Sequence, residues 1–252
     1  MPNNFTEFPL HRPELLETLR RGDRLLTEAM SQDRKRSRKG DEIIRASERC
    51  DTIYRLEAGW VCRSRVLDDG RRSIVTVFLP GDLFGVKSML STEPPDAVVA
   101  LSNVTALAIK HDRLQQLFAA EPSVALRLAF QLGEDERRLH NYLIALGRGN
   151  AEERIATMLL ELHGRLLLAG ITQNGAFQMP LTQQEIGDFT GLTLVHVNRV
   201  LRRLRENGLA TVDRRTVEIH DLPKLHRLAL PILDTFQRTR PEFGGGRQQL
   251  WH

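Results

Sequence analysis

The sequence predicts an α+β protein: an antiparallel β-roll, then a long helix, then a compact helical motif that ends in a β-hairpin. Three observations predict this order. Short runs rich in β-branched residues, separated by turn signals, occupy residues 41–110. Leucines at helical spacing follow over residues 128–146. Between residues 181 and 206, a capping sequence and a turn glycine introduce two short amphipathic segments.

Length and composition are those of an ordinary globular protein. The chain has 252 residues, of which 41% are apolar and 27% are charged. At about 150 residues per domain, this length suggests one large domain or two smaller ones. No apolar run approaches the roughly 18 residues of a membrane-spanning helix. Charges and prolines interrupt residues 1–20, where a signal peptide needs an apolar core. We therefore expect a cytoplasmic protein with no membrane partner.

The basic residues are mostly arginine: 31 are Arg and 5 are Lys, and the formal net charge is +4. Arginine suits bidentate recognition of phosphates and bases better than lysine does, but a GC-rich genome also raises arginine content. The positions of the arginines, rather than their number, must therefore indicate a function.

The sequence offers no constellation for catalysis or for a metal. Two cysteines, Cys50 and Cys62, are too few for an iron–sulfur cluster or a closed zinc site. Motifs for a nucleophile elbow, a P-loop or a dinucleotide site are absent, and His140 and His163 lie on predicted helices without a catalytic partner. We expect no enzyme activity, no metal and no cofactor. A redox pair of the two cysteines stays open, although buried structural thiols are commoner.

Residues 1–40 are charged and compatible with a helix, and they end in a basic run at residues 34–39. Such a run can contact nucleic acid, but a solvated surface segment is the commoner structure. We favour the surface segment, because Gly40 opens a strand pattern directly afterwards.

The hydrophobic period changes to two between residues 41 and 110. The predicted strands are 43–44, 52–56, 60–67, 73–79, 97–101 and 105–110. Asp68-Asp69-Gly70, between two alternating runs, predicts a hairpin. Several short strands at regular spacing predict a small antiparallel barrel or roll. A roll encloses an interior, so it suits a sensor domain.

Helical spacing begins after residue 111, and Pro122 suits the first turn of a helix. A leucine stripe then runs along it: Leu128, Leu132, Leu139, Leu143 and Leu146. Packing against the roll would explain one apolar face. However, the stripe persists for nearly three heptads and the opposite face is very polar. We favour pairing with the same helix of a second copy about a two-fold axis. Residues 147–149 then predict a hinge, 151–168 an amphipathic helix and 170–179 a loop.

Residues 181–208 predict a helix-turn-helix. Thr182 and Glu185 have the spacing of a capping box, with Thr182 as the N-cap. The first helix runs to about residue 190, and Gly191 supplies the turn. Thr193 then caps a second helix, which ends near Asn207.

The second predicted helix has two distinct faces at about 100° per residue. Its buried stripe comprises Val197, Val200, Leu201 and Leu204. The opposite face carries Val195, Arg199, Arg202 and Glu206, with His196, Asn198 and Arg203 on its shoulders. Arginine, histidine and asparagine can donate hydrogen bonds to base edges and phosphates, so this face suits the major groove of double-stranded DNA.

Charge is concentrated in the same region. Residues 191–215 carry six arginines against Glu206 and Asp213, an excess of four that equals the net charge of the chain. Residues 209–212 and 216–219 predict a hairpin with two arginines at its tip, which completes a winged helix-turn-helix. The predicted DNA contacts are Thr182, Gln183, Thr193, Val195, His196, Asn198, Arg199, Arg202, Arg203, Arg214 and Arg215.

With these features, the chain resembles the CRP/FNR superfamily of bacterial transcription factors. The matching segments are 81–85 (GDLFG) in the roll, 146–154 (LGRGNAEER), 181–187 (LTQQEIG) and 191–199 (GLTLVHVNR). The resemblance covers about residues 25–230. It implies a roll like a cyclic-nucleotide-binding domain, and a homodimer that contacts a palindromic operator and RNA polymerase.

The roll departs from the pattern of members that bind cyclic nucleotides. Those members carry Glu directly after the glycine that is Gly85 here, and an Arg-Ser or Arg-Thr pair about ten residues later. Val86 and the segment with Asp96 and Ala97 occupy these places. An aspartate repels a phosphate, so we do not expect a conventional cyclic nucleotide. Gly85, Val86, Asp96 and Ala97 remain the candidate pocket for an unidentified small-molecule effector.

Two further departures concern the signal and the operator. Members that hold an iron–sulfur cluster need N-terminal cysteines, whereas the first cysteine here is Cys50. Many members carry Glu where Val195 stands, and Glu accepts a hydrogen bond from cytosine. Val195 instead suits a thymine methyl group, and Arg199 is the candidate for a bidentate contact to guanine.

The expected organisation is a sensor roll at 1–120, a dimerisation helix at 121–147, a DNA-binding domain at 148–230 and a tail at 231–252. The leading hypothesis is a homodimeric transcriptional regulator that binds DNA. The alternative is a module that binds a small ligand, or senses redox state through Cys50 and Cys62, with weak or lost DNA binding.

Overall fold

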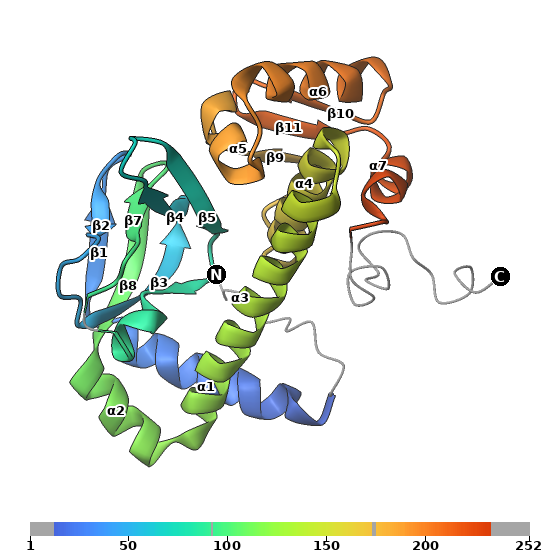
Figure 1. The fold of residues 1–252 in the computed structure, drawn as a ribbon. Helices are drawn as coiled ribbons and strands as arrows, with labels where there is room; N and C mark the ends of the chain where they lie inside the picture. Colours follow the sequence, from blue (N-terminus) through green and yellow to red (C-terminus); the bar gives the residue numbers. More distant parts are fainter. Residues whose placement is uncertain (1–12, 92, 173–174, 233–252) are drawn as a thin grey trace. The chain divides into compact units, whose positions relative to one another are not determined.

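The computed structural model describes residues 13–91, 93–172 and 175–232 (Figure 1). The chain forms two compact units, divided between Glu136 and Arg137. This division falls inside the longest described helix, α3 (Pro122–Arg148). The expected tail lies outside the described residues from 233 onward. The expected domain boundaries remain an interpretation.

The first unit is a roll of two antiparallel four-stranded sheets preceded by a helix, as the sequence predicts. A 3-10 turn (Pro13–Leu15) leads into α1 (Leu16–Met30). One sheet has the order β1 (Arg34–Ser37), β8 (Val104–Lys110), β3 (Thr52–Ala58) and β6 (Leu83–Phe84). The other has the order β2 (Glu42–Ile44), β7 (Ala97–Ala100), β4 (Val61–Val66) and β5 (Arg72–Phe78). Figure 1 shows the two sheets facing each other.

Two apolar clusters hold this unit together. One fills the space between the sheets and includes Leu56, Val61, Phe78 and Phe84. The other joins the first sheet to α1, to α2 (His111–Ala120) and to the start of α3. Because each cluster draws on segments far apart in the sequence, burial of apolar surface fixes the roll as a whole.

Two strands of the roll were not predicted. The basic run is an exposed strand at the edge of its sheet, β1, paired from Arg34 opposite Leu107 to Ser37 opposite Val104. The prediction of a surface segment is right about exposure and wrong about structure, because strand pairing uses backbone groups and tolerates charged side chains at an edge. The strand β6 has two residues, too few for a periodic signal, and a 3-10 turn (Val86–Met89) follows it.

The structure corrects the prediction that Leu128 of the leucine stripe is a dimer contact. Leu128 is 4% exposed and packs in the core cluster with Leu26 and Val124. It therefore belongs to the interior of the first unit. Leu132, one turn later, is exposed.

The second unit contains the remaining helices and a small sheet. Its helices after α3 are α4 (Ala151–Leu168), α5 (Gln183–Thr190), α6 (Leu194–Glu206) and α7 (Leu222–Ala229). The sheet has the order β10 (Ala210–Asp213), β11 (Thr216–Ile219) and β9 (Ala176–Gln178). The strand β9 corrects the loop predicted over 170–179, because Phe177 is buried and pairs with Val217.

The helix break predicted at residues 147–149 falls at Gly149 and Asn150, between α3 and α4. Asn150 caps α4 in a capping box with Glu153. No helix in the described part of the chain is long and apolar enough to cross a membrane. Within the same residues, no group of three or more His, Cys, Asp or Glu side chains is placed to hold a metal.

Candidate nucleic-acid interface

The helix-turn-helix forms where the sequence predicts it, and local hydrogen bonds explain its limits. The backbone N–H of Glu185 donates to Thr182 Oγ1 at 3.2 Å, and the N–H of Thr182 donates to Glu185 Oε2 at 2.7 Å. Gly191 ends α5 in the left-handed conformation, with φ of 65°. Thr193 caps α6 by accepting the N–H of His196. A cap of this kind contributes about 1 kcal/mol to helix stability.

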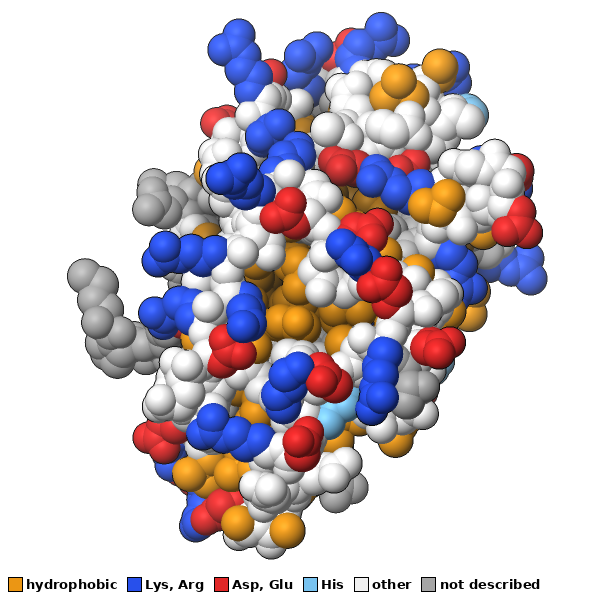
Figure 2. Space-filling model, turned by 90° about the vertical axis from the view of Figure 1, so that its left-hand side faces the viewer, with side chains coloured by type: hydrophobic (Ala, Val, Ile, Leu, Met, Phe, Trp, Pro, Cys, Tyr) orange, Lys and Arg blue, Asp and Glu red, His pale blue; other side chains and the backbone are white. Residues whose placement is uncertain are grey.

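The two predicted faces of α6 are confirmed. Val197, Val200, Leu201 and Leu204 are buried. The opposite face is exposed, and Val195 has 66% of its surface open to solvent. Figure 2 shows Lys and Arg side chains (blue) projecting at the top of the view, at the level of α6 in Figure 1.

A hollow of about 450 Å³ lies along this exposed face. It brings together eight residues from α5, α6 and β10: Gln183, Val195, Asn198, Arg199, Leu201, Arg202, Arg205 and Val212. Five of these were among the predicted DNA contacts. Arg205 was not, although it follows Arg202 by three residues and therefore lies on the same side of the helix.

Some of the predicted contacts already have protein partners. Asn198 Nδ2 donates to the carbonyl of Leu194 at 3.0 Å, and His196 Nδ1 lies 3.0 Å from Thr193 Oγ1. These local bonds orient both side chains along the helix.

Two of the arginines form ion pairs at the surface. Arg203 Nη1 lies 2.8 Å from Glu152 Oε1 on α4, and Arg202 Nε lies 3.6 Å from Glu206 Oε1. All four side chains are partly or largely exposed, and such pairs contribute only about 0–1 kcal/mol. A phosphate can therefore compete for these guanidinium groups at low cost.

The wing is a two-residue hairpin between β10 and β11, with exposed Arg214 and Arg215 at its tip. Both arginines have positive φ, 43° and 75°, as a tight hairpin turn requires at its two central residues. The carbonyl of Arg215 accepts the N–H of Met179 at 2.7 Å, which ties the tip to the segment after β9.

The candidate effector pocket, comprising Gly85, Val86, Asp96 and Ala97, lies in the first unit, whereas the basic face of α6 belongs to the second. Asp96 accepts a hydrogen bond from Arg65 Nε at 2.8 Å, so its charge is neutralised. Val86 is buried, and Gly85 has φ of 83°, where a side chain would lie 2.9 Å from the carbonyl of Thr52. In the same unit, Cys50 is half-buried and Cys62 is fully buried, and no disulfide joins these two cysteines.

The roll also contains a buried cation that sequence reasoning missed. Arg63 is almost fully buried on β4, and its guanidinium lies 5.4 Å from the ring centre of Phe78. Burial lowers the pKa of Arg63, while Asp135 and Asp96 act in the opposite direction. Desolvation of its own ammonium group lowers the pKa of Lys87, and the positive charge of Arg63 lowers it further. Residues 61–64 of β4 are all buried, so alternation of apolar and polar residues along this strand could not have indicated the burial of Arg63.

The fold and this surface define a DNA-binding transcription regulator of the winged helix-turn-helix type. Comparison with protein families identifies a cyclic nucleotide-binding domain over residues 34–121 and a Crp-like helix-turn-helix domain over residues 153–228. The transcriptional activator protein FnrA of Stutzerimonas stutzeri is 29% identical over 78% of this chain and 80% of that protein.

Solved structures agree with these matches. FixK2 from Bradyrhizobium japonicum superimposes with a TM-score of 0.71 at 30% identity, over 77% of this chain and 96% of that one. A CRP-family transcriptional regulator from Thermus thermophilus gives a TM-score of 0.62 at 29% identity, over 79% of this chain and 98% of that one. The chain belongs to the CRP/FNR superfamily of bacterial transcription regulators, whose matched members are regulators and not enzymes.

Proposed function

We propose that the protein binds a palindromic operator as a homodimer, with α6 of each copy in the major groove. The observation that carries this proposal is the exposed basic face of α6 around its hollow. Arg199 is the candidate for a bidentate contact to guanine, and Val195 for a thymine methyl group. Thr182 and Gln183 stand at the N-terminus of α5, where backbone amides attract a phosphate.

The proposed dimer contact is the exposed part of the leucine stripe on α3. Leu132 and Leu146 are each about two-fifths exposed, Leu143 is 68% exposed and Leu139 is half-buried. Leu132, Leu139 and Leu146 recur every seven residues, which is the repeat of a helix that pairs with a parallel copy. A second copy would remove this apolar stripe from water.

The decisive experiment is selection of bound sequences from a random DNA pool, followed by mass measurement of the complex. We expect a palindromic sequence bound by two copies. Leu143→Glu should yield a monomer with operator affinity lower by about 100-fold, because the two half-sites no longer act together. Leu90→Glu is the matched control, since Leu90 is 92% exposed on the first unit. A single copy bound to an asymmetric sequence would contradict the proposal.

We further propose that the roll senses an anionic small molecule. The buried guanidinium of Arg63 and the exposed ammonium group of Lys87 favour a negative ligand, while Asp96 is already paired with Arg65. A search for co-purifying ligands by native mass spectrometry tests this, with Arg63→Gln as the variant that should lose them. The alternative, a binding module without DNA output, predicts ligand binding but no selected operator.

The names of the relatives favour activation of transcription, which requires contact with RNA polymerase in the cytoplasm. Transcription in vitro from a promoter that carries the selected operator tests the direction of the effect. We expect the transcript to increase with the protein; a decrease would favour repression.

A further inference from the structure

The side chain of Arg154 lies where three segments of the second unit meet: the end of α3, the break before α4 and the end of α5. Its Nη2 donates to the carbonyl of Leu146 at 2.9 Å, and its Nε donates to the carbonyl of Gly149 at 2.9 Å. The last carbonyls of a helix have no partner within the helix, so a single guanidinium satisfies two acceptors at the end of α3.

The same guanidinium reaches the helix-turn-helix. Arg154 Nη1 lies 3.5 Å from the carbonyl of Thr190, the last residue of α5. The C-terminal ends of α3 and α5 both carry partial negative charge, and a cation between them is favourable for each. Arg154 therefore bonds to the helix that carries the leucine stripe and also to the first helix of the DNA-binding motif.

Two neighbouring contacts hold α3 and α5 at short range. The rings of Tyr142 and Phe189 pack with their centres 4.6 Å apart. Gly191 has no side chain, and a Cβ there would lie 2.8 Å from Leu146 Cδ2 and 3.6 Å from Arg154 Nη1. The end of α3 and the turn after α5 are therefore in close contact beside the guanidinium of Arg154.

We propose that Arg154 is a positioning residue for operator recognition: it fixes the helix-turn-helix relative to the end of α3, and so fixes the separation of the two recognition helices in the dimer. This inference rests on the proposed homodimer. The two recognition helices can engage a palindrome together only if their separation matches the distance between half-sites.

The geometry of the guanidinium, rather than its charge, suits Arg154 to this positioning role. Arginine presents five donors in a rigid plane, whereas lysine offers a compact charge that cannot reach three carbonyls in fixed directions. The positioning role therefore predicts that Arg154→Lys fails in the same way as Arg154→Gln. A direct contact to a DNA phosphate predicts that lysine restores function.

The test measures affinity for operators whose half-sites are moved one base pair closer or further apart, and for a single half-site. We expect wild type to favour its best spacing by roughly tenfold or more, and both Arg154 variants to fall to about twofold. Affinity for the single half-site should stay within about twofold of wild type, because the reading surface itself is unchanged. Arg227→Gln, on the exposed side of α7, controls for the loss of one positive charge.

The inference would be overturned by a wild-type spacing preference in Arg154→Gln, by restoration of that preference in Arg154→Lys, or by an equal loss of affinity at every spacing and at the single half-site. Phe189→Leu weakens the same junction while staying apolar, so it should relax the spacing preference even where Arg154→Gln fails to fold. A wild-type protein that binds half-sites as a monomer would overturn the homodimer and this inference together. If wild type is a dimer, and Arg154→Gln and Phe189→Leu both keep the wild-type preference for half-site spacing, the inference about Arg154 is overturned and the homodimer stands.

Discussion

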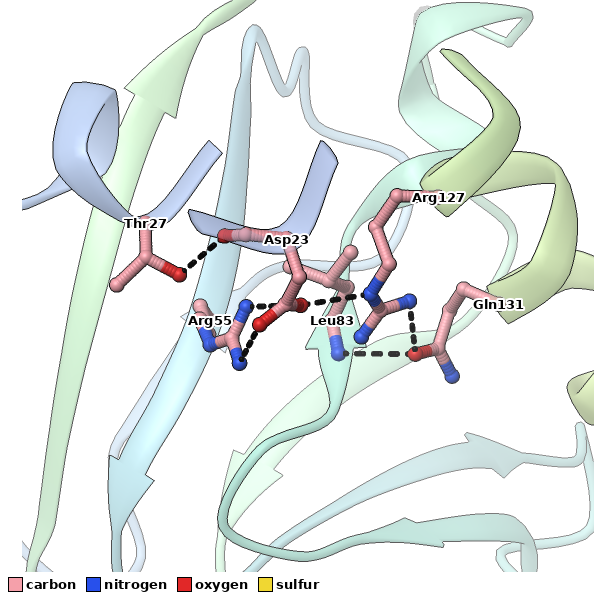
Figure 3. Close-up of polar contacts among 6 residues, drawn as sticks. All are labelled: Asp23, Thr27, Arg55, Leu83, Arg127 and Gln131. Atoms are coloured by element: carbon pink, nitrogen blue, oxygen red, sulfur yellow. Dashed lines mark hydrogen bonds and ion pairs between the residues drawn. The ribbon is translucent and has the colours of Figure 1, made fainter. Parts of the chain in front are cut away.

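The carboxylate of Asp23 on α1 accepts two hydrogen bonds from the guanidinium of Arg55 on β3, at 2.6 and 2.9 Å (Figure 3). Arg127 on α3 donates to the same carboxylate at 2.7 Å, so one acid serves two arginines in the interior of the first unit. Gln131 continues the network by accepting from Arg127 and from the N–H of Leu83. Four elements, α1, β3, β6 and α3, are thereby joined.

Replacement of Asp23 by asparagine should therefore destabilise the roll severely. Two buried guanidinium groups would lose their charged partner, and breaking a buried pair in this way costs about 3–5 kcal/mol. Urea denaturation followed by circular dichroism measures the change in the free energy of unfolding. The control is Glu57→Gln, which breaks the surface pair with Arg34 and should cost far less, because solvent screens that pair. Equal losses in the two variants would contradict the importance of burial.

The same carboxylate should make the roll sensitive to acid. Burial raises the pKa of Asp23, but the charges and hydrogen bonds of Arg55 and Arg127 outweigh it, so that the pKa lies below its usual value. A lowered folded-state pKa adds stability above the unfolded-state pKa of about 4, and this contribution is lost as pH falls through the folded-state value.

The free energy of unfolding, measured between neutral pH and about pH 3, checks this expectation. The difference in stability between wild type and Asp23→Asn should be constant at neutral pH and should shrink below about pH 4. A difference that grows as the pH falls would contradict the sign of the pKa shift.

The helix-turn-helix could be predicted from the sequence because its determinants are local. Thr182 and Glu185 are three residues apart, and the buried stripe of α6 spans only eight residues, from Val197 to Leu204. The network in the roll could not be predicted, because Asp23 is 32 residues from Arg55 and 104 from Arg127. Periodicity describes which face of an element is buried, but it does not identify the partner across the core.

The leucine stripe illustrates the same limit. Leu128 and Leu132 share one face of α3 by spacing, yet Leu128 is buried against Leu26 and Leu132 is exposed. The pattern indicates an apolar face without stating whether the roll or a second copy covers it. The strand β1 was missed for the opposite reason, since its side chains are charged and only its backbone pairs.

Arg199→Ala should relax the preference for one base in each half-site. Loss of a bidentate contact to guanine costs about 1–3 kcal/mol at the preferred sequence and much less at others. Sequence selection with wild type and variant measures the change in base preference. Arg227→Ala, on α7, should leave the selected sequence unaltered. An unchanged preference in Arg199→Ala would remove this residue from base recognition.

Arg215→Gly should separate the stability of the wing from its affinity for DNA. Arg215 has φ of 75°, a conformation that costs a non-glycine residue about 1–2 kcal/mol and that glycine adopts readily. After the entropic cost of glycine in the unfolded chain, the free energy of unfolding should rise by about 0.5–1 kcal/mol. The N–H of Met179 keeps its acceptor, since the bond uses the backbone carbonyl of residue 215.

DNA affinity should change in the opposite direction, because the exposed guanidinium at the wing tip is lost. If Arg215 neutralises one phosphate, the slope of log affinity against log salt should fall by about 0.9 in magnitude for each wing that contacts the duplex. Thr216→Gly is the matched control: Thr216 lies in β11 next to the turn, where glycine should lower stability by about 0.5–1 kcal/mol and leave the salt slope unchanged. An Arg215→Gly variant that is less stable than wild type, with an unaltered salt slope, would contradict both roles of the wing tip.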